Sequence, residues 1–141
     1  LRGTVRAVEQ SERERLLARI EEVARNVSAA ARCEATFERG RGCPPVVNDE
    51  RVADVVRAAA IDAVGEEQVL VAQPVTVGDD VACLLQQVPG CYFLVGAGDQ
   101  GGRPMPPHHH PEFDIDERCL RVGVETMSRA ALGLLQDLSL G

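Results

Sequence analysis

At 141 residues the chain has the length of about one domain, which is enough to bury a core. Its formal net charge of −7, without any basic block, argues against nucleic acid and anionic membranes as partners, because neither attracts an acidic surface. The sequence shows no initiator Met, signal peptide or long apolar run, so we interpret it as part of a larger soluble, cytoplasmic protein.

The cysteines are odd in number, widely spaced and without a Cys-x-x-Cys pair: Cys33, Cys43, Cys83, Cys91 and Cys119. This pattern is typical of buried thiols in a reducing cytoplasm, and it argues against a disulfide framework or a structural zinc site. We therefore expect free and mostly buried cysteines.

The N-terminal part, residues 1–42, predicts a strand, a helix and a second strand. Residues 1–7 and 35–39 have the composition of short strands. Between them, Ser11 and Glu14 have the spacing of a capping box, which predicts a helix to about Arg32. Apolar residues recur along one face of that helix: Leu16, Ile20, Val23 and Val27.

Residues 40–45 form the clearest boundary in the chain, because two glycines are followed by two prolines. We expect a hinge there, with residues 1–42 and 43–141 folding around separate cores.

Beyond the hinge, helices and strands are predicted to alternate. Asn48 or Asp49 caps a helix that ends at Gly65, and 68–72 is a short apolar strand. A second helix begins with residues 76–80, and the apolar residues 91–95 are typical of a central parallel strand. The last helix, about 115–138, is predicted to begin at a capping box of Asp114 and Glu117 and to bury a stripe of apolar residues: Leu120, Val124, Met127, Ala131, Leu134 and Leu138. This alternation predicts an α/β layer architecture.

The stretch that most resembles a chemical site is the histidine segment, residues 104–117, in which three histidines stand among prolines. Proline stiffens an extended backbone, and imidazole is a common ligand of zinc-like ions near neutral pH. Side chains alternate along an extended segment, so His109 points away from His108 and His110, and one ligand is the economical expectation. The alternative is an exposed loop without a ligand.

Residues 96–101 satisfy the Gly-x-Gly-x-x-Gly spacing of a dinucleotide-binding fold. That motif requires a helix to begin at its third glycine, and Gly101 is followed by a proline-rich run that cannot form one. We therefore do not expect a nucleotide-binding site.

Four segments occur in an order that carries a family resemblance: Cys-Pro-Pro-Val-Val-Asn-Asp at 43–49, Val-Gly-Asp-Asp-Val-Ala at 77–82, Val-Pro-Gly-Cys-Tyr-Phe-Leu-Val-Gly-Ala-Gly at 88–98 and His-His-Pro-Glu-Phe-Asp-Ile-Asp-Glu at 109–117. Together they resemble the C-terminal part of the N-acyl-amino-acid amidohydrolases, which include hippurate hydrolase and the indole-acetyl-amino-acid hydrolases. The resemblance implies that 43–141 ends an α/β, phosphorylase/hydrolase-like catalytic domain. It also implies that 1–42 is the second half (β-α-β) of a ferredoxin-like lid domain through which the full-length protein forms a homodimer.

The same resemblance implies a metal-dependent hydrolase of N-acyl amino acids such as hippurate, with two divalent ions per full-length subunit, whether Zn, Mn, Ni or Co. His109, two residues before Pro111, corresponds to the family's last metal ligand. The other ligands and the catalytic residues do not map onto this chain, so the piece alone is expected to be inactive. Where the family commonly has Glu-Asp, this chain has Asp79-Asp80, which either cap a helix or serve an unassigned role.

A different class of function also fits the sequence. The chain could be a non-catalytic dimerisation or interaction module. Metal titration of the intact protein against this piece discriminates the two, because only the hydrolase predicts tight metal binding that depends on residues outside the piece.

Overall fold

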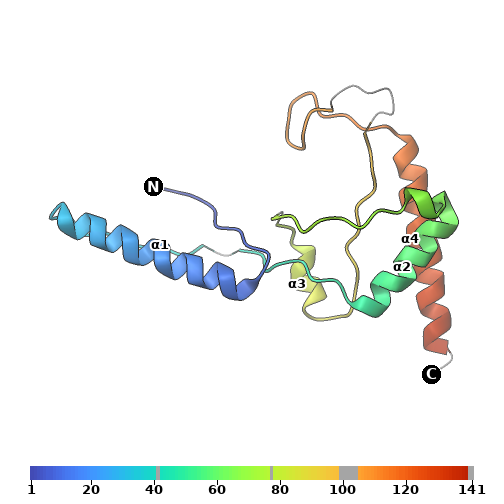
Figure 1. Cartoon of the computed structure of the whole chain (residues 1–141), viewed down its shortest axis with the longest axis horizontal. Helices are drawn as coiled ribbons and strands as arrows, with labels where there is room; N and C mark the ends of the chain where they lie inside the picture. Colours follow the sequence, from blue (N-terminus) through green and yellow to red (C-terminus); the bar gives the residue numbers. More distant parts are fainter. Residues whose placement is uncertain (41, 77, 99–104, 140–141) are drawn as a thin grey trace. The chain divides into compact units, whose positions relative to one another are not determined.

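A computed structural model describes residues 1–40, 42–76, 78–98 and 105–139, and all of the regular structure in them is helical (Figure 1). Its elements are α1 (Gln10–Ala30), α2 (Glu50–Val64), the short 3-10 helix η1 (Glu66–Gln68), α3 (Val81–Leu85) and α4 (Arg118–Ser139). Backbone contacts divide the chain into unit 1, Leu1–Val47 with Ala72–Pro89, and unit 2, Asn48–Val71 with Gly90–Gly141. The predicted boundary between residues 42 and 43 stays a prediction.

The predicted α/β fold, with its β-α-β half of a ferredoxin-like domain, is wrong for the described residues, which contain no strand. The segment from Cys91 is extended, but its backbone pairs with a side chain: the Tyr92 N–H donates to Asn48 Oδ1 at 2.8 Å, and the Tyr92 carbonyl accepts from Asn48 Nδ2 at 3.0 Å. An apolar pattern reports which side chains are buried, whereas a strand requires a second backbone segment that supplies the ladder of hydrogen bonds. The pattern alone therefore could not establish a sheet.

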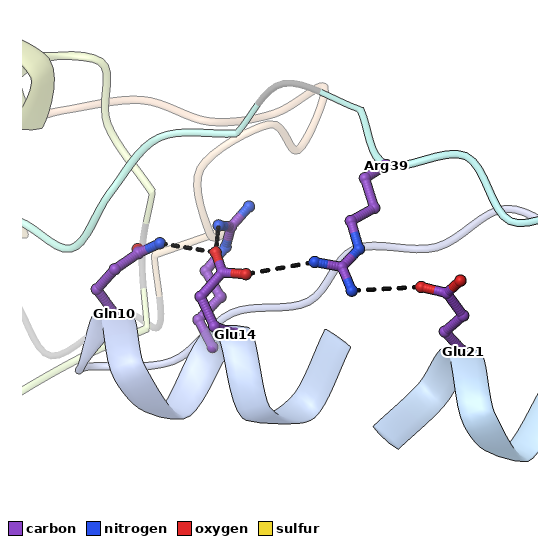
Figure 2. Close-up of polar contacts among 5 residues, drawn as sticks. Gln10, Glu14, Glu21 and Arg39 are labelled. Atoms are coloured by element: carbon purple, nitrogen blue, oxygen red, sulfur yellow. Dashed lines mark hydrogen bonds and ion pairs between the residues drawn. The ribbon is translucent and has the colours of Figure 1, made fainter. Parts of the chain in front are cut away.

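Helix α1 forms where the sequence predicts it, although the predicted capping box is wrong because Ser11 lies inside the helix and Glu9, at the N-cap position, makes no side-chain cap bond. No residue of α1 is buried. Ion pairs cover one side of it: Figure 2 shows the Arg39 guanidinium between Glu14 and Glu21, at 3.4 and 3.3 Å. The expected stripe is largely exposed, with Val27 at 65%.

Helix α2 confirms the predicted start and stop signals. The Asp49 carboxylate accepts from the Val52 N–H at 3.0 Å, which satisfies one of the free N–H groups at the helix start. Gly65 ends the helix with a φ of 88°, a conformation that a side chain disfavours. The buried side of α2 packs on α4 and forms the core of unit 2 with the following residues: Val52, Val56, Ala59 and Ala130, with Cys91, Phe93 and Leu134 against them.

Helix α4 begins later than predicted. Asp114 Oδ1 accepts from the adjacent Ile115 N–H at 2.8 Å, so the predicted box with Glu117 is wrong. Asp116 instead accepts from the Arg118 N–H at 3.0 Å, and the helix starts at Arg118.

The buried face of α4 also differs from the predicted one. Among the side chains of α4 that the structure describes, the buried ones are Thr126 and Ala130, at 2% and 5% exposure, whereas Val124 of the predicted stripe is 68% exposed. Small residues on α4 allow this face to pack closely on α2. At Gly133 the two helices are so close that an added Cβ would lie 3.2 Å from Val55 Cγ1. The side chain of Leu138, the last residue of the predicted stripe, lies outside the described part.

Two further expectations concern cysteines and membranes. Cys33, Cys43 and Cys83 are exposed and Cys91 and Cys119 are half-buried, so the expectation of mostly buried thiols is wrong. Within the described part of the chain, no helix has the length and apolar character needed to cross a membrane.

Candidate functional site

The described part of the histidine segment, 105–117, folds into two tight turns, and the predicted extended conformation is therefore wrong. The His110 N–H donates to the Pro107 carbonyl at 3.1 Å, and the Phe113 N–H donates to the His110 carbonyl at 2.9 Å. His109, at the first turn, has a φ of +71°, one of two positive values among the described non-glycine residues. Such a conformation costs about 1–3 kcal/mol and persists where surrounding bonds enforce it. The turns and prolines provide that enforcement here.

The three imidazoles have different surroundings. The His108 ring stands edge-on to Phe113, with centroids 4.8 Å apart and planes at 78°. The Nδ1 atom of His110 accepts a hydrogen bond from the Glu112 N–H at 3.1 Å, so that nitrogen is occupied. The His109 ring is exposed and makes no hydrogen bond or ring contact with any residue that the structure describes. Both of its nitrogens are therefore available to an external group.

An available, neutral imidazole is a good donor to a divalent cation. A protein site needs three or four such donors, and the described ranges contain no group of three His, Cys, Asp or Glu side chains able to hold a metal. His109 thus fits as one donor of a site completed by residues elsewhere. Its role as a ligand stays a prediction.

The end of the histidine segment is bound to another part of unit 2. The Asp116 N–H donates to the Ala97 carbonyl at 3.0 Å, which ties the segment to the residues that follow the core. Hydrogen bonds from the Arg118 side chain, and then from its backbone, lower the pKa of Asp116 to about 2. Asp116 is therefore a carboxylate at neutral pH, and its bonds to Arg118 hold the start of α4 in place.

The acidic pair of unit 1 lies at the start of α3. Asp79 Oδ1 accepts from the Val81 N–H at 2.9 Å, and the Asp80 carbonyl accepts from the Cys83 N–H at 2.9 Å. The Asp79 carboxylate therefore caps the helix, which favours the capping interpretation over a chemical role for this residue.

Two other features bear on the site. A hollow of about 310 Å³ in unit 1 is lined by apolar residues such as Pro45, Val47 and Leu85, and none of the histidines lines it. The nucleotide-binding interpretation depended on Gly101, which lies outside the described residues.

The sequence does not predict the double hydrogen bond of Asn48 to the Tyr92 backbone. It predicts only a helix-capping role for Asn48. The signal was the primary amide itself, because it matches both the donor and the acceptor of one backbone residue. Its role is to hold the extended segment beside the first residues of α2.

Comparison with known proteins identifies relatives along nearly the whole chain. Residues 3–133 match the model of peptidase family M20/M25/M40. A putative amidohydrolase of Bacillus subtilis, YhaA, is 32% identical over 132 residues, which cover 92% of this chain and 33% of that protein. The N-acetyl-L-cysteine deacetylase of Bacillus subtilis is 35% identical over 121 residues, covering 85% and 27%. An Arabidopsis thaliana protein, IAA-amino acid hydrolase ILR1-like 5, is 29% identical over 141 residues, covering 97% and 32%. The chain spans about a third of the length of these relatives.

Proposed function

The chain belongs to peptidase family M20/M25/M40, and we propose that it is the C-terminal portion of a metal-dependent hydrolase that cleaves the amide bond of N-acyl amino acids. The family match confirms the resemblance carried by the four sequence segments. The names of two relatives support the substrate class, because one is a deacetylase of N-acetyl-L-cysteine and another is an IAA-amino acid hydrolase. Hippurate belongs to the same chemical class.

The observation that carries the proposal in this chain is the state of His109. The histidine that the resemblance assigns as a metal ligand is also the one whose ring has no partner among the described residues and whose backbone has a positive φ. Packing on Phe113 and the bond from Glu112 engage the other two rings.

Members of this family generally use divalent metal ions. We propose two ions per full-length subunit, drawn from Zn, Mn, Ni and Co, with a ring nitrogen of His109 as one ligand. Bound there, a divalent ion would supply Lewis-acid chemistry, polarising the scissile carbonyl and activating a water. The two turns fix the backbone at His109, and the Asp116 bonds hold the end of the histidine segment at the start of α4. The remaining ligands and the general base are proposed to lie in the rest of the full-length protein.

A role in dimerisation is the second candidate, and a specific observation favours it. Three apolar residues on one side of α1 are exposed: Ile20 at 42%, Val23 at 43% and Val27 at 65%. A stripe with this spacing suits a symmetric contact with the same helix of a second copy. In this second proposal the chain is a non-catalytic dimerisation or interaction module. In the hydrolase proposal, by contrast, residues 1–42 form the dimerisation part of a homodimer and residues 43–141 the catalytic portion. Limited proteolysis tests that boundary, with a first cut expected within residues 40–45.

Hydrolysis assays decide between the two candidates. We expect the full-length protein to release free amino acid from N-acetyl-L-cysteine, an indole-acetyl amino acid or hippurate, to lose this activity with a chelator and to regain it with a divalent ion. We expect no turnover from the 141-residue chain, because it supplies one ligand of several. A full-length protein that is inactive on all three substrates yet dimeric would contradict the hydrolase and support the module. Turnover by the 141-residue chain would contradict the assignment of the missing ligands.

A further inference from the structure

His110 is the residue shared by the two turns of the histidine segment. Its N–H closes the first turn by donating to the Pro107 carbonyl at 3.1 Å, and its carbonyl closes the second by accepting from the Phe113 N–H at 2.9 Å. Its side chain adds a third bond, because Nδ1 accepts from the Glu112 N–H at 3.1 Å. One residue therefore holds both turns together.

The first turn places His109 at its third position. Among residues 107–110, His109 alone has a positive φ, of +71°. That pattern is the one of a type II turn, in which the third position needs a positive φ and is usually glycine or asparagine. A histidine there is held in a conformation that its own side chain disfavours. The backbone of His109 therefore depends on the bonds that close the turn, and the next residue, His110, makes them.

In the second turn the side chain of His110 acts as an aspartate or asparagine commonly does. Pro111 stands at the second position, where its ring presets the φ that the turn needs. An Asx turn forms when the side chain at the first position accepts from the N–H two residues further on. Here the acceptor is an imidazole nitrogen, so the neutral ring carries its proton on Nε2. The bond thus engages His110 in the turn.

We propose that His110 is a positioning residue for His109, acting through the bond between its Nδ1 and the Glu112 N–H. This inference rests on the proposed function, in which His109 binds a divalent ion. The φ and ψ of His109 set the direction in which its side chain leaves the backbone. Without the bond, the second turn loosens, and His109 is free to return to a negative φ, which the L configuration favours. The ion then loses a well-placed donor, and its affinity falls.

Two amide side chains of different length test this role. His110→Asn keeps an acceptor close to the backbone and can form the Asx turn, whereas His110→Gln carries the same amide one methylene further out and His110→Ala has no acceptor. We measure the affinity of the full-length protein for Zn²⁺ by competition with a chelating indicator. It should fall about 10- to 100-fold in His110→Ala and His110→Gln, and return to near the wild-type value in His110→Asn. A ring that only covers surface would give no such difference between the two amides.

The turn itself is followed by amide exchange at Glu112, measured relative to the intrinsic rate. Protection should fall in His110→Ala and His110→Gln and be kept in His110→Asn. His108→Ala is the matched control, because the His108 ring packs on Phe113 and makes no hydrogen bond with any residue that the structure describes. We expect it to leave both the Zn²⁺ affinity and the Glu112 protection unchanged.

Unchanged Zn²⁺ affinity in His110→Ala, or equal affinities in His110→Asn and His110→Gln, would overturn the proposal. These measurements follow binding and not turnover. A wild-type protein that binds Zn²⁺ but hydrolyses no N-acyl amino acid would therefore contradict the proposed function alone, whereas one that binds no Zn²⁺ would contradict both.

Discussion

Helices α1 and α4 are of similar length, yet their surroundings are opposite. Helix α4 packs on α2 and contributes the buried Ala130 and Thr126, whereas α1 buries no residue and is flanked by ion pairs such as that of Arg25 with Glu21 at 2.6 Å. Burial of apolar surface stabilises a helix at about 25 cal/mol per Å². Exposed ion pairs contribute little, because water and salt screen them. A regular apolar period therefore predicts a helix without showing whether the helix belongs to a core.

The largest expected effect is in the α2–α4 core. Ala130→Asp places an unpaired carboxylate at a site that is 5% exposed, and we expect a loss of about 3 kcal/mol or more in the free energy of unfolding. Ala131→Asp is the matched control, because the same substitution lies one position along the same helix on an exposed site. Urea unfolding followed by circular dichroism measures both. Equal losses in the two variants would show that α4 is not packed as described.

A smaller effect is expected at the start of α2. Asp49→Ala removes the carboxylate that accepts from the Val52 N–H, and the loss of such a cap costs about 1 kcal/mol. Asp49→Asn should restore most of that loss, because its side-chain oxygen also accepts. The same urea series measures both variants. If Asp49→Asn were as destabilised as Asp49→Ala, the hydrogen bond would not be the cause.

In α1 the expected effect is smaller again and depends on salt. Arg39→Ala removes the contacts with Glu14 and Glu21, and hydrogen exchange of the α1 amides should become faster at low ionic strength. At 1 M salt, where the screening length is about 3 Å, the variant and the wild type should exchange alike. Arg2→Ala, which removes an exposed arginine of unit 1 that has no such contact among the described residues, should change neither rate. A salt-independent difference for Arg39→Ala would point to packing and would contradict the contrast with α4.

The smallest effect is confined to the first turn of α4. The pKa of Asp116 is lowered from 3.8 to about 2 by its bonds with Arg118. Because the folded pKa lies below the unfolded one, this contribution is present above about pH 4 and is lost as the pH falls toward 2. The protection of the Arg118 and Cys119 amides, measured relative to the intrinsic exchange rate at each pH, should therefore fall over that range, and Asp116→Asn should abolish this fall. An NMR titration that gave Asp116 a pKa of 3.8 would contradict the described bonds.

How far the sequence predicts the structure depends on whether a signal is local. The cap at Asp49 and the stop at Gly65 were predicted correctly because each acts within one helical turn. The strands were not, because strand formation depends on a partner segment that no local pattern specifies. The buried face of α4 was also missed. Bulky apolar residues and small ones follow the same period there, and the close approach of Gly133 to Val55 selects the small ones.

The candidate site also combines a signal that is local in the sequence with a feature that only the folded structure shows. His109 was singled out from a motif, and the structure adds a reason that the sequence does not contain: the two turns that leave its ring without a partner among the described residues.

We propose that His109 is the metal ligand that this chain contributes to a family hydrolase. The decisive measurement is of metal content and turnover, side by side, for the full-length protein carrying His108→Ala, His109→Ala or His110→Ala. We expect His109→Ala to lose one of two ions and nearly all activity, and the other two variants to keep both ions and lose at most about 10- to 100-fold in activity. Retention of both ions by His109→Ala, or loss of an ion from His108→Ala or His110→Ala, would contradict it.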